Sequence, residues 1–250
     1  MNWLNVLIGK KKVSKCICVV GMHRSGTSCL TGIMQGIGVE LGEVFTENLF
    51  NKRGNRENNR ITTLNHAVLV HNQGDWNRPV LAKRWTSKHA QERDAIIAEL
   101  SGRTDTYWGF KDPRVLFTLD FWLERLESPD FVGTYRHPHR VALSLQNRDN
   151  TPFEQSWNLW LVYNRRLLEL ARRYRFAMVD FDAEPEAYLE EVISALIGLG
   201  LDESQVDRGR EFFDAKLRNQ AKSRVDDVAL PSEVSALYAE LLDYKKRYQA

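Results

Sequence analysis

The sequence predicts an α/β fold of three layers, with a central, mainly parallel sheet between two layers of helices. Two observations lead to this prediction. Short runs rich in β-branched and aromatic residues alternate with longer runs of helical periodicity along the 250 residues. One such run, KCICVV, leads through the glycine-rich turn GMHRSGTS (21–28) straight into an apolar helix. In such folds ligands bind beyond the carboxyl ends of the strands, so we expect the functional site there.

The elements follow in order from these patterns. We expect strands at the β-rich runs 15–20, 106–110, 130–135 and 176–180. We expect helices at 26–37, 58–72, 88–100, 115–126, 138–148, 153–174, 185–199 and 231–248. The longest, 153–174, repeats apolar side chains such as Phe153, Trp157 and Trp160 at helical spacing. No repeat or Pro/Gly/Ser-rich linker interrupts the series, so a single domain spanning 1–250 is expected.

Composition excludes several classes of partner. With 35 basic and 33 acidic residues the net charge is +2, so no global field attracts nucleic acid or an anionic membrane, and anion binding must come from local clusters. Cys16, Cys18 and Cys29 lie in or beside apolar runs and are interpreted as reduced core residues, and no metal site is expected. The lysines of MNWLNVLIGKKK follow the apolar residues, unlike a secretory signal, and no membrane span is present, so a cytoplasmic protein is expected.

The turn GMHRSGTS resembles the nucleotide P-loop G-x-x-x-x-G-K-[ST], which predicts a P-loop-like fold. Gly21, Gly26 and Ser28 are in register, but Thr27 stands where the lysine should be. That lysine reaches the nucleotide phosphates in NTPases, so its loss argues against an ordinary kinase or ATPase, and a kinase or NTPase with a degenerate loop remains an alternative. The candidate anion ligands around Gly26 are one imidazole, one guanidinium and three hydroxyls: His23, Arg24, Ser25, Thr27 and Ser28.

A second candidate anion site lies in TYRHPHRVALSLQNRD, residues 134–149. Arg136 falls at the end of a predicted strand, and Pro138 suits the first turn of the following helix. Ser144 comes eight residues after Arg136 in that helix. An arginine at a strand end and a helical serine can clamp one phosphate through charge-assisted hydrogen bonds, each worth roughly 1.5 to 3 kcal/mol.

Together the two motifs resemble the signature of the sulfotransferases that use 3′-phosphoadenylyl sulfate (PAPS). In that family a loop [RK]-S-G-T-[ST] binds the 5′-phosphosulfate, and an Arg with a Ser eight residues later binds the 3′-phosphate. Arg24 to Ser28 match the loop, and Arg136 with Ser144 match the second element. The resemblance covers about residues 15–180. It implies metal-free, in-line transfer of a sulfuryl group from PAPS to a hydroxyl of a saccharide, glycolipid or small metabolite, with adenosine 3′,5′-bisphosphate (PAP) as product.

Two further stretches resemble the bacterial branch of the family. Residues 51–76 carry N, G and E before a helix and G-x-W after it, and residues 108–122 contain the element K-D-P-R. The resemblance implies that Arg24 and Lys111 meet the sulfuryl and departing oxygens, while Thr27 and Ser28 hold the 5′-phosphate. It also offers Arg218, in FFDAKLRNQ, as a further ligand of the 3′-phosphate, although the family's glycine-containing form of that loop is absent.

The sequence leaves the identity of the general base open. Cytosolic sulfotransferases place a histidine two residues after the lysine that Lys111 resembles, and here that residue is Pro113. Other branches use a glutamate after the phosphosulfate helix, where Glu57 lies, although a glutamate there also suits a helix start. The remaining candidates for the base are Asp112, His66 and His71. A protein that binds the nucleotide but lacks a base, and so catalyses nothing, is the second alternative.

Overall fold

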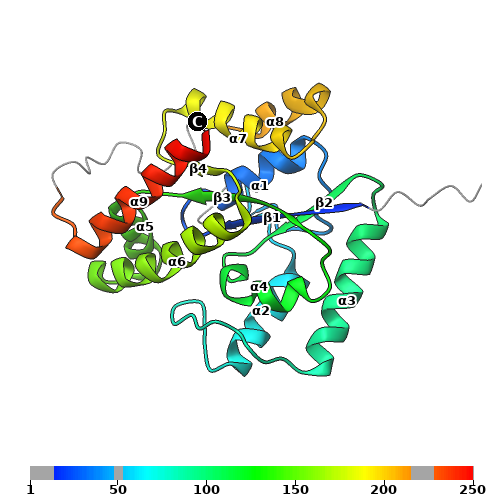
Figure 1. Ribbon diagram of the computed structural model, residues 1–250, viewed down its shortest axis with the longest axis horizontal. Coiled ribbons are helices and arrows are strands. Elements are labelled where there is room, and N and C mark those ends of the chain that lie inside the picture. Colours follow the sequence, from blue (N-terminus) through cyan, green and yellow to red (C-terminus); the bar gives the residue numbers. More distant parts are fainter. Residues whose placement is uncertain (1–13, 48–52, 215–227, 250) are drawn as a thin grey trace, which may run out of the picture.

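The computed structural model describes residues 14–47, 53–214 and 228–249. Its centre is a sheet of four parallel strands in the order β2-β1-β3-β4 (Figure 1). The strands are β1 (Lys15–Gly21), β2 (Tyr107–Lys111), β3 (Asp130–Tyr135) and β4 (Met178–Asp180). Helices lie on both sides of the sheet, which confirms the predicted three-layer α/β fold.

Side chains of β1 alternate between two apolar cores, one on each face of the sheet. Cys16, Cys18 and Val20 belong to one core, and Ile17 and Val19 to the other. The second core is covered by α1 (Thr27–Gly36), α7 (Pro185–Gly198) and α8 (Val206–Phe212), with the short 3₁₀ helix η1 (Glu203–Gln205) before α8. The first is covered by α2 (Asn59–His71), α3 (Ser87–Gly102), α4 (Val115–Leu123), α5 (Pro138–Asp149), α6 (Phe153–Tyr174) and α9 (Ser232–Gln249).

All four predicted strands and all eight predicted helices are present within a few residues of their expected bounds. The sequence patterns missed α8 and η1. Helix α8 has seven residues, four of them charged, so its apolar pattern is too short to recognise. It packs closely on α1 because Gly209 faces Ile37 and an added Cβ there would lie 2.7 Å from that side chain.

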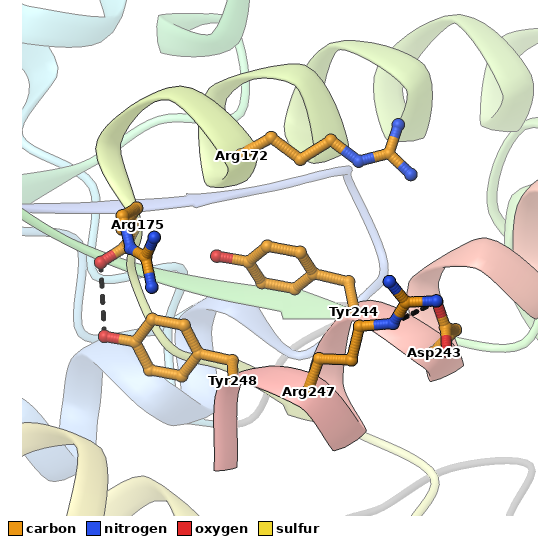
Figure 2. Close-up of a pocket in the computed structure, with 6 residues that line it drawn as sticks. All are labelled: Arg172, Arg175, Asp243, Tyr244, Arg247 and Tyr248. Atoms are coloured by element: carbon orange, nitrogen blue, oxygen red, sulfur yellow. Dashed lines mark hydrogen bonds and ion pairs between the residues drawn. The ribbon is translucent and has the colours of Figure 1, made fainter. Parts of the chain in front are cut away.

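The C-terminal helix α9 docks against the end of α6 through tyrosine hydroxyls (Figure 2). The Tyr244 hydroxyl lies 2.8 Å from the carbonyl oxygen of Ala171 and 3.0 Å from that of Phe176, and Tyr248 donates to the carbonyl of Arg175 at 3.2 Å. These hydroxyls tie α9 to the last turn of α6 and to the two residues that follow it. Arginines of both helices line the small pocket between them (Figure 2).

These arginines sit where two helices end. Arg172 lies in the last turn of α6 and Arg247 in the last turn of α9, where positive side chains complement the negative ends of the helix dipoles. Arg172 is also paired with Glu240, and Arg247 with Asp243, at 2.8 and 2.9 Å. We therefore attribute this pocket to helix docking. Across residues 14–47, 53–214 and 228–249, no helix combines the length and the apolar composition that crossing a bilayer requires.

Candidate active site

Within the described residues, both predicted anion motifs lie with Lys111 and Glu57 at the carboxyl ends of β1, β2 and β3. Because the strands are parallel, Gly21 at the end of β1 pairs with Thr134 of β3, and Val19 pairs with Lys111 of β2. The glycine-rich turn after β1 is joined to β3 at this edge. The Thr134 hydroxyl donates to the carbonyl oxygen of Ser25 at 2.8 Å, and an added Cβ on Gly21 would lie 2.5 Å from the Thr134 carbonyl oxygen.

The turn itself leaves the N-terminus of α1 open. Arg24 and Gly26 have φ of 67° and 83°, which turn the chain sharply into the helix. Gly26 is the N-cap residue, and among the described residues no side chain caps the first N–H groups of α1. The Ser25 hydroxyl oxygen is buried and has no hydrogen-bond partner in the described part of the chain. Uncapped N–H groups at the positive end of a helix dipole suit an anion.

Arg24 joins the two predicted anion motifs. Its Nε donates to the hydroxyl oxygen of Ser144 at 2.7 Å, and Arg136 Nη1 lies 3.3 Å from the carbonyl oxygen of Arg24. The structure therefore brings together motifs more than 100 residues apart in the sequence. Burial, followed by the positive charges of Arg148 and Arg136, lowers the pKa of Arg24 to about 10. Such mutual repulsion between cations would be relieved by a bound anion.

Asp182 orients Arg136, and sequence reasoning missed it. Its Oδ1 accepts from Arg136 Nε at 3.1 Å and from Arg140 Nη1 at 2.8 Å. Burial alone would raise the pKa of Asp182, but the charge of Arg136 and the contacts with Arg140 and the His137 N–H outweigh it and hold that pKa below its usual value. The Phe181 ring packs 5.1 Å from the Arg136 guanidinium carbon. The sequence feature that could have identified Asp182 is a carboxylate two residues after the end of a predicted strand.

Lys111 connects the start of α1 with the segment before α2. Its Nζ donates to Glu57 Oε1 at 2.6 Å and lies 3.4 Å from the hydroxyl oxygen of Ser28, and its side chain is 2% exposed. Glu57 does not cap α2, because the side chain of Asn58 accepts from the Arg60 N–H in that role. The alternative explanation of Glu57 as a helix cap therefore does not hold, and its carboxylate faces the lysine instead.

Two solved structures with a similar architecture are described as sulfotransferases. The sulfotransferase domain of the olefin synthase from Synechococcus PCC 7002 has a TM-score of 0.57 at 18% identity, over 93% of this chain and 96% of that one. Sulfotransferase STF9 from Mycobacterium avium has a TM-score of 0.54 at 14% identity, over 92% and 76%. The chain has the sulfotransferase fold. No family model and no curated protein sequence matches it.

Asp112 is enclosed in this sulfotransferase fold. Its carboxylate is fully buried and accepts from Asn65 Nδ2 at 2.9 Å, from the Arg114 N–H at 3.1 Å and from Arg114 Nε at 2.9 Å. Asn65 in turn accepts from Thr118 and Trp122. This network ties the end of β2 to α2 and α4. The carboxylate of Asp112 is thus engaged in holding Arg114 and its own loop.

The other proposed bases lie at the surface of α2. The His66 side chain is half exposed, with Nδ1 3.5 Å from Asp75 Oδ1. His71 is exposed and packs its ring against that of His89, with 5.7 Å between centroids. Glu57 is the candidate base that the structure places against Lys111. Arg218, the further candidate for the 3′-phosphate, lies outside the described residues.

A ring cluster around His23 borders the site. Its imidazole meets the rings of Trp76 and Tyr163 edge to face, with centroids 5.3 and 5.5 Å away, and the Tyr163 hydroxyl donates to the Trp76 carbonyl at 2.7 Å. Burial, then the charges of Arg114 and Arg148 with those of Lys111 and Arg24, hold the pKa of His23 well below 6.5. The imidazole is therefore neutral at pH 7. Trp76 belongs to the predicted G-x-W, whereas Trp108, Trp122 and Trp160 are core residues.

Proposed function

We propose that the protein is a sulfotransferase that moves a sulfuryl group from PAPS to a hydroxyl of a saccharide, glycolipid or small metabolite. The observation that carries this proposal is the 2.7 Å hydrogen bond from Arg24 to Ser144, with Arg136 against the Arg24 carbonyl. These contacts support two candidate anion sites that lie side by side at the carboxyl ends of β1 and β3. A donor with a phosphosulfate at one end and a phosphate at the other requires two such sites, whereas a simple phosphate-binding turn requires one.

The residues present fit this donor. The uncapped N-terminus of α1, with the hydroxyls of Thr27 and Ser28, would hold the 5′-phosphosulfate. Arg136 and Ser144 would hold the 3′-phosphate. Arg24 would serve both ends, since its backbone belongs to the first site and its guanidinium touches the second. The low pKa of Arg24, caused by burial and neighbouring cations, supports an anion at this place.

Transfer then needs positioning, charge stabilisation and one base. The acceptor oxygen attacks sulfur in line, the bond from sulfur to the bridging oxygen breaks, and its electron pair leaves with the 5′-phosphate of PAP. The acceptor's proton passes to the Glu57 carboxylate. Lys111 and Arg24 stabilise the charge on the sulfuryl and departing oxygens, a contribution typically worth about 10² to 10³ in turnover for one such donor. Asp112 keeps the loop after β2 in place.

Two measurements test the proposal. Thermal unfolding should show stabilisation by PAP in the presence of EDTA, by about 2.7 kcal/mol at 100 times the dissociation constant. Incubation with ³⁵S-labelled PAPS and fractionated glycans, lipids and metabolites should label an acceptor. Stabilisation by ATP with magnesium and not by PAP would indicate a kinase or NTPase. PAP binding without label in any fraction would indicate a nucleotide-binding protein that lacks the transfer activity.

A further inference from the structure

The ammonium of Lys111 is shared between two parts of the site. It is almost fully buried, and it contacts the Glu57 carboxylate at 2.6 Å and the Ser28 hydroxyl at 3.4 Å. A buried ammonium is costly unless an opposite charge lies beside it. In the described residues, Glu57 provides that charge. The carboxylate of the residue proposed as the base is therefore engaged by Lys111.

The backbone of Glu57 is held in place before α2. Its carbonyl oxygen accepts from the Phe45 N–H at 3.1 Å, and the next residue, Asn58, forms a β-bridge with Val44 and caps α2. Lys111 instead reaches its partners over a flexible four-carbon stem from the end of β2. Lys111 can therefore exchange partners by a movement of its side chain, while the backbone at Glu57 stays in place.

A donor bound at the start of α1 would meet both charges. The Ser28 hydroxyl lies in the first turn of α1, where the proposed phosphosulfate site is, so an anionic oxygen beside it would also lie beside Lys111 Nζ. The two contacts of Nζ place the Glu57 carboxylate oxygen within about 6 Å of that hydroxyl. A phosphosulfate there is attracted by the lysine and repelled by the glutamate, across a distance at which such charges interact strongly in a partly buried site.

We propose that the donor and Glu57 compete for the Lys111 ammonium. Donor binding draws Lys111 onto the phosphosulfate and leaves the Glu57 carboxylate free to accept the acceptor's proton, so the base becomes available only after the donor is in place. This inference rests on the proposed function and adds to it the order in which the donor binds and the base becomes available. The coupling runs in both directions, because a carboxylate that holds Lys111 must also weaken donor binding.

The variant Glu57→Gln distinguishes competition for Lys111 from a role of Glu57 in proton transfer alone. If Glu57 acts only as a base, its neutral amide leaves nucleotide affinity unchanged. If it competes for Lys111, the amide binds PAP more tightly, on the order of tenfold, since one like charge near the phosphosulfate site is removed. Lys111→Met removes the ammonium for which the donor and Glu57 compete. Adding Glu57→Gln to Lys111→Met should therefore increase PAP affinity much less than Glu57→Gln does in the wild type.

The experiment is calorimetric titration of PAP into the wild type, Glu57→Gln, Lys111→Met and the double variant at one pH and salt concentration. Glu127→Gln is the matched control, because this exposed glutamate precedes β3 at the opposite edge of the sheet. Tighter binding by Glu57→Gln, absent from the control and reduced with Lys111→Met, supports the proposal. Unchanged or weaker binding by Glu57→Gln overturns it. If Lys111→Met does not fold, the comparison of Glu57→Gln with wild type decides alone.

Failure of the inference is distinguishable from failure of the proposed function. If PAP binds the wild type but Glu57→Gln does not tighten it, competition for Lys111 is wrong and the two anion sites remain. If PAP binds neither the wild type nor any variant, the donor assignment itself is wrong.

Discussion

Arg24 Nε donates a hydrogen bond to Ser144 Oγ over 2.7 Å, so the guanidinium of the first anion motif rests on the serine of the second. Arg24 comes from the turn after β1, and Ser144 from the second turn of α5. The contact exists because β1 and β3 are neighbours in the sheet, which brings the elements that follow them together. A ligand that binds Ser144 must therefore also affect the position of Arg24.

This contact predicts that Arg24 and Ser144 act as a unit. Arg24→Ala and Ser144→Ala should each weaken PAP binding by about 10- to 100-fold, the value of one charge-assisted hydrogen bond. The double variant should lose clearly less than the sum of the two free-energy costs, because either change already breaks the shared contact. Calorimetric titrations of the four proteins give the coupling directly. Strictly additive free-energy costs would show that Arg24 and Ser144 bind PAP independently of each other.

Asp182 is predicted to be essential for the placement of Arg136. Asp182→Asn leaves two buried or half-buried guanidiniums, Arg136 and Arg140, without their shared carboxylate. Breaking such a pair costs about 3 to 5 kcal/mol, so the melting temperature should fall by roughly 10 °C. The control is Glu233→Gln, whose ion pair with Arg165 is largely exposed and contributes about 1 kcal/mol or less. Equal melting temperatures for the two variants would refute this role of Asp182.

Local patterns sufficed to predict the elements of this chain. The helix over 153–174 was predicted with the bounds that the structure has, because a 22-residue amphipathic segment with aromatic anchors leaves little ambiguity. Strands β1 to β4 were also found, since short apolar runs between helices suit a parallel sheet buried on both faces. The prediction of two phosphate-type motifs likewise depended only on residues close together in the sequence.

What the sequence did not provide are the contacts between distant segments. The order β2-β1-β3-β4 decides that Arg24 meets Ser144, and no local pattern contains that order. Asp182 carries no motif of its own, and only the position of β4 beside β3 brings it to Arg136. The pairing of Glu57 with Lys111 likewise depends on where the loop before α2 crosses the end of β2.

Gly26 is predicted to tolerate no side chain. Its φ of 83° disfavours any L-residue, and an added Cβ would lie 2.2 Å from the ring of Phe181, which packs against Arg136. Gly26→Ala should therefore reduce both the free energy of unfolding, by about 1 to 3 kcal/mol, and PAP affinity. The control is Gly198→Ala at the end of α7, where the added methyl meets nothing within 4 Å. That control should be neutral or slightly stabilising in chemical denaturation.

His23 should make the protein lose stability as the pH falls below neutrality. Its pKa in the folded protein lies well below 6.5, because of burial and of the nearby arginines and lysine. As the pH drops through 6.5 the unfolded chain takes up a proton at this residue while the folded protein does not, so unfolding becomes more favourable. The effect is absent above about pH 7.5 and grows by at most 1.4 kcal/mol per pH unit below 6.5, until the folded pKa is reached.

His23→Gln removes this titration and keeps a polar side chain beside Trp76. Denaturant unfolding of both proteins at pH 5, 6, 7, 7.5 and 8 should give the same difference in free energy of unfolding at pH 7.5 and pH 8. Below pH 6.5 the difference should move in favour of the variant, because only the wild type carries the proton-linked penalty. The remaining histidines contribute to both curves and cancel in the comparison. Parallel curves from pH 8 to pH 5 would mean that His23 accepts a proton as readily in the folded protein as in the unfolded chain, and that the cations around it are neutralised by their carboxylate partners.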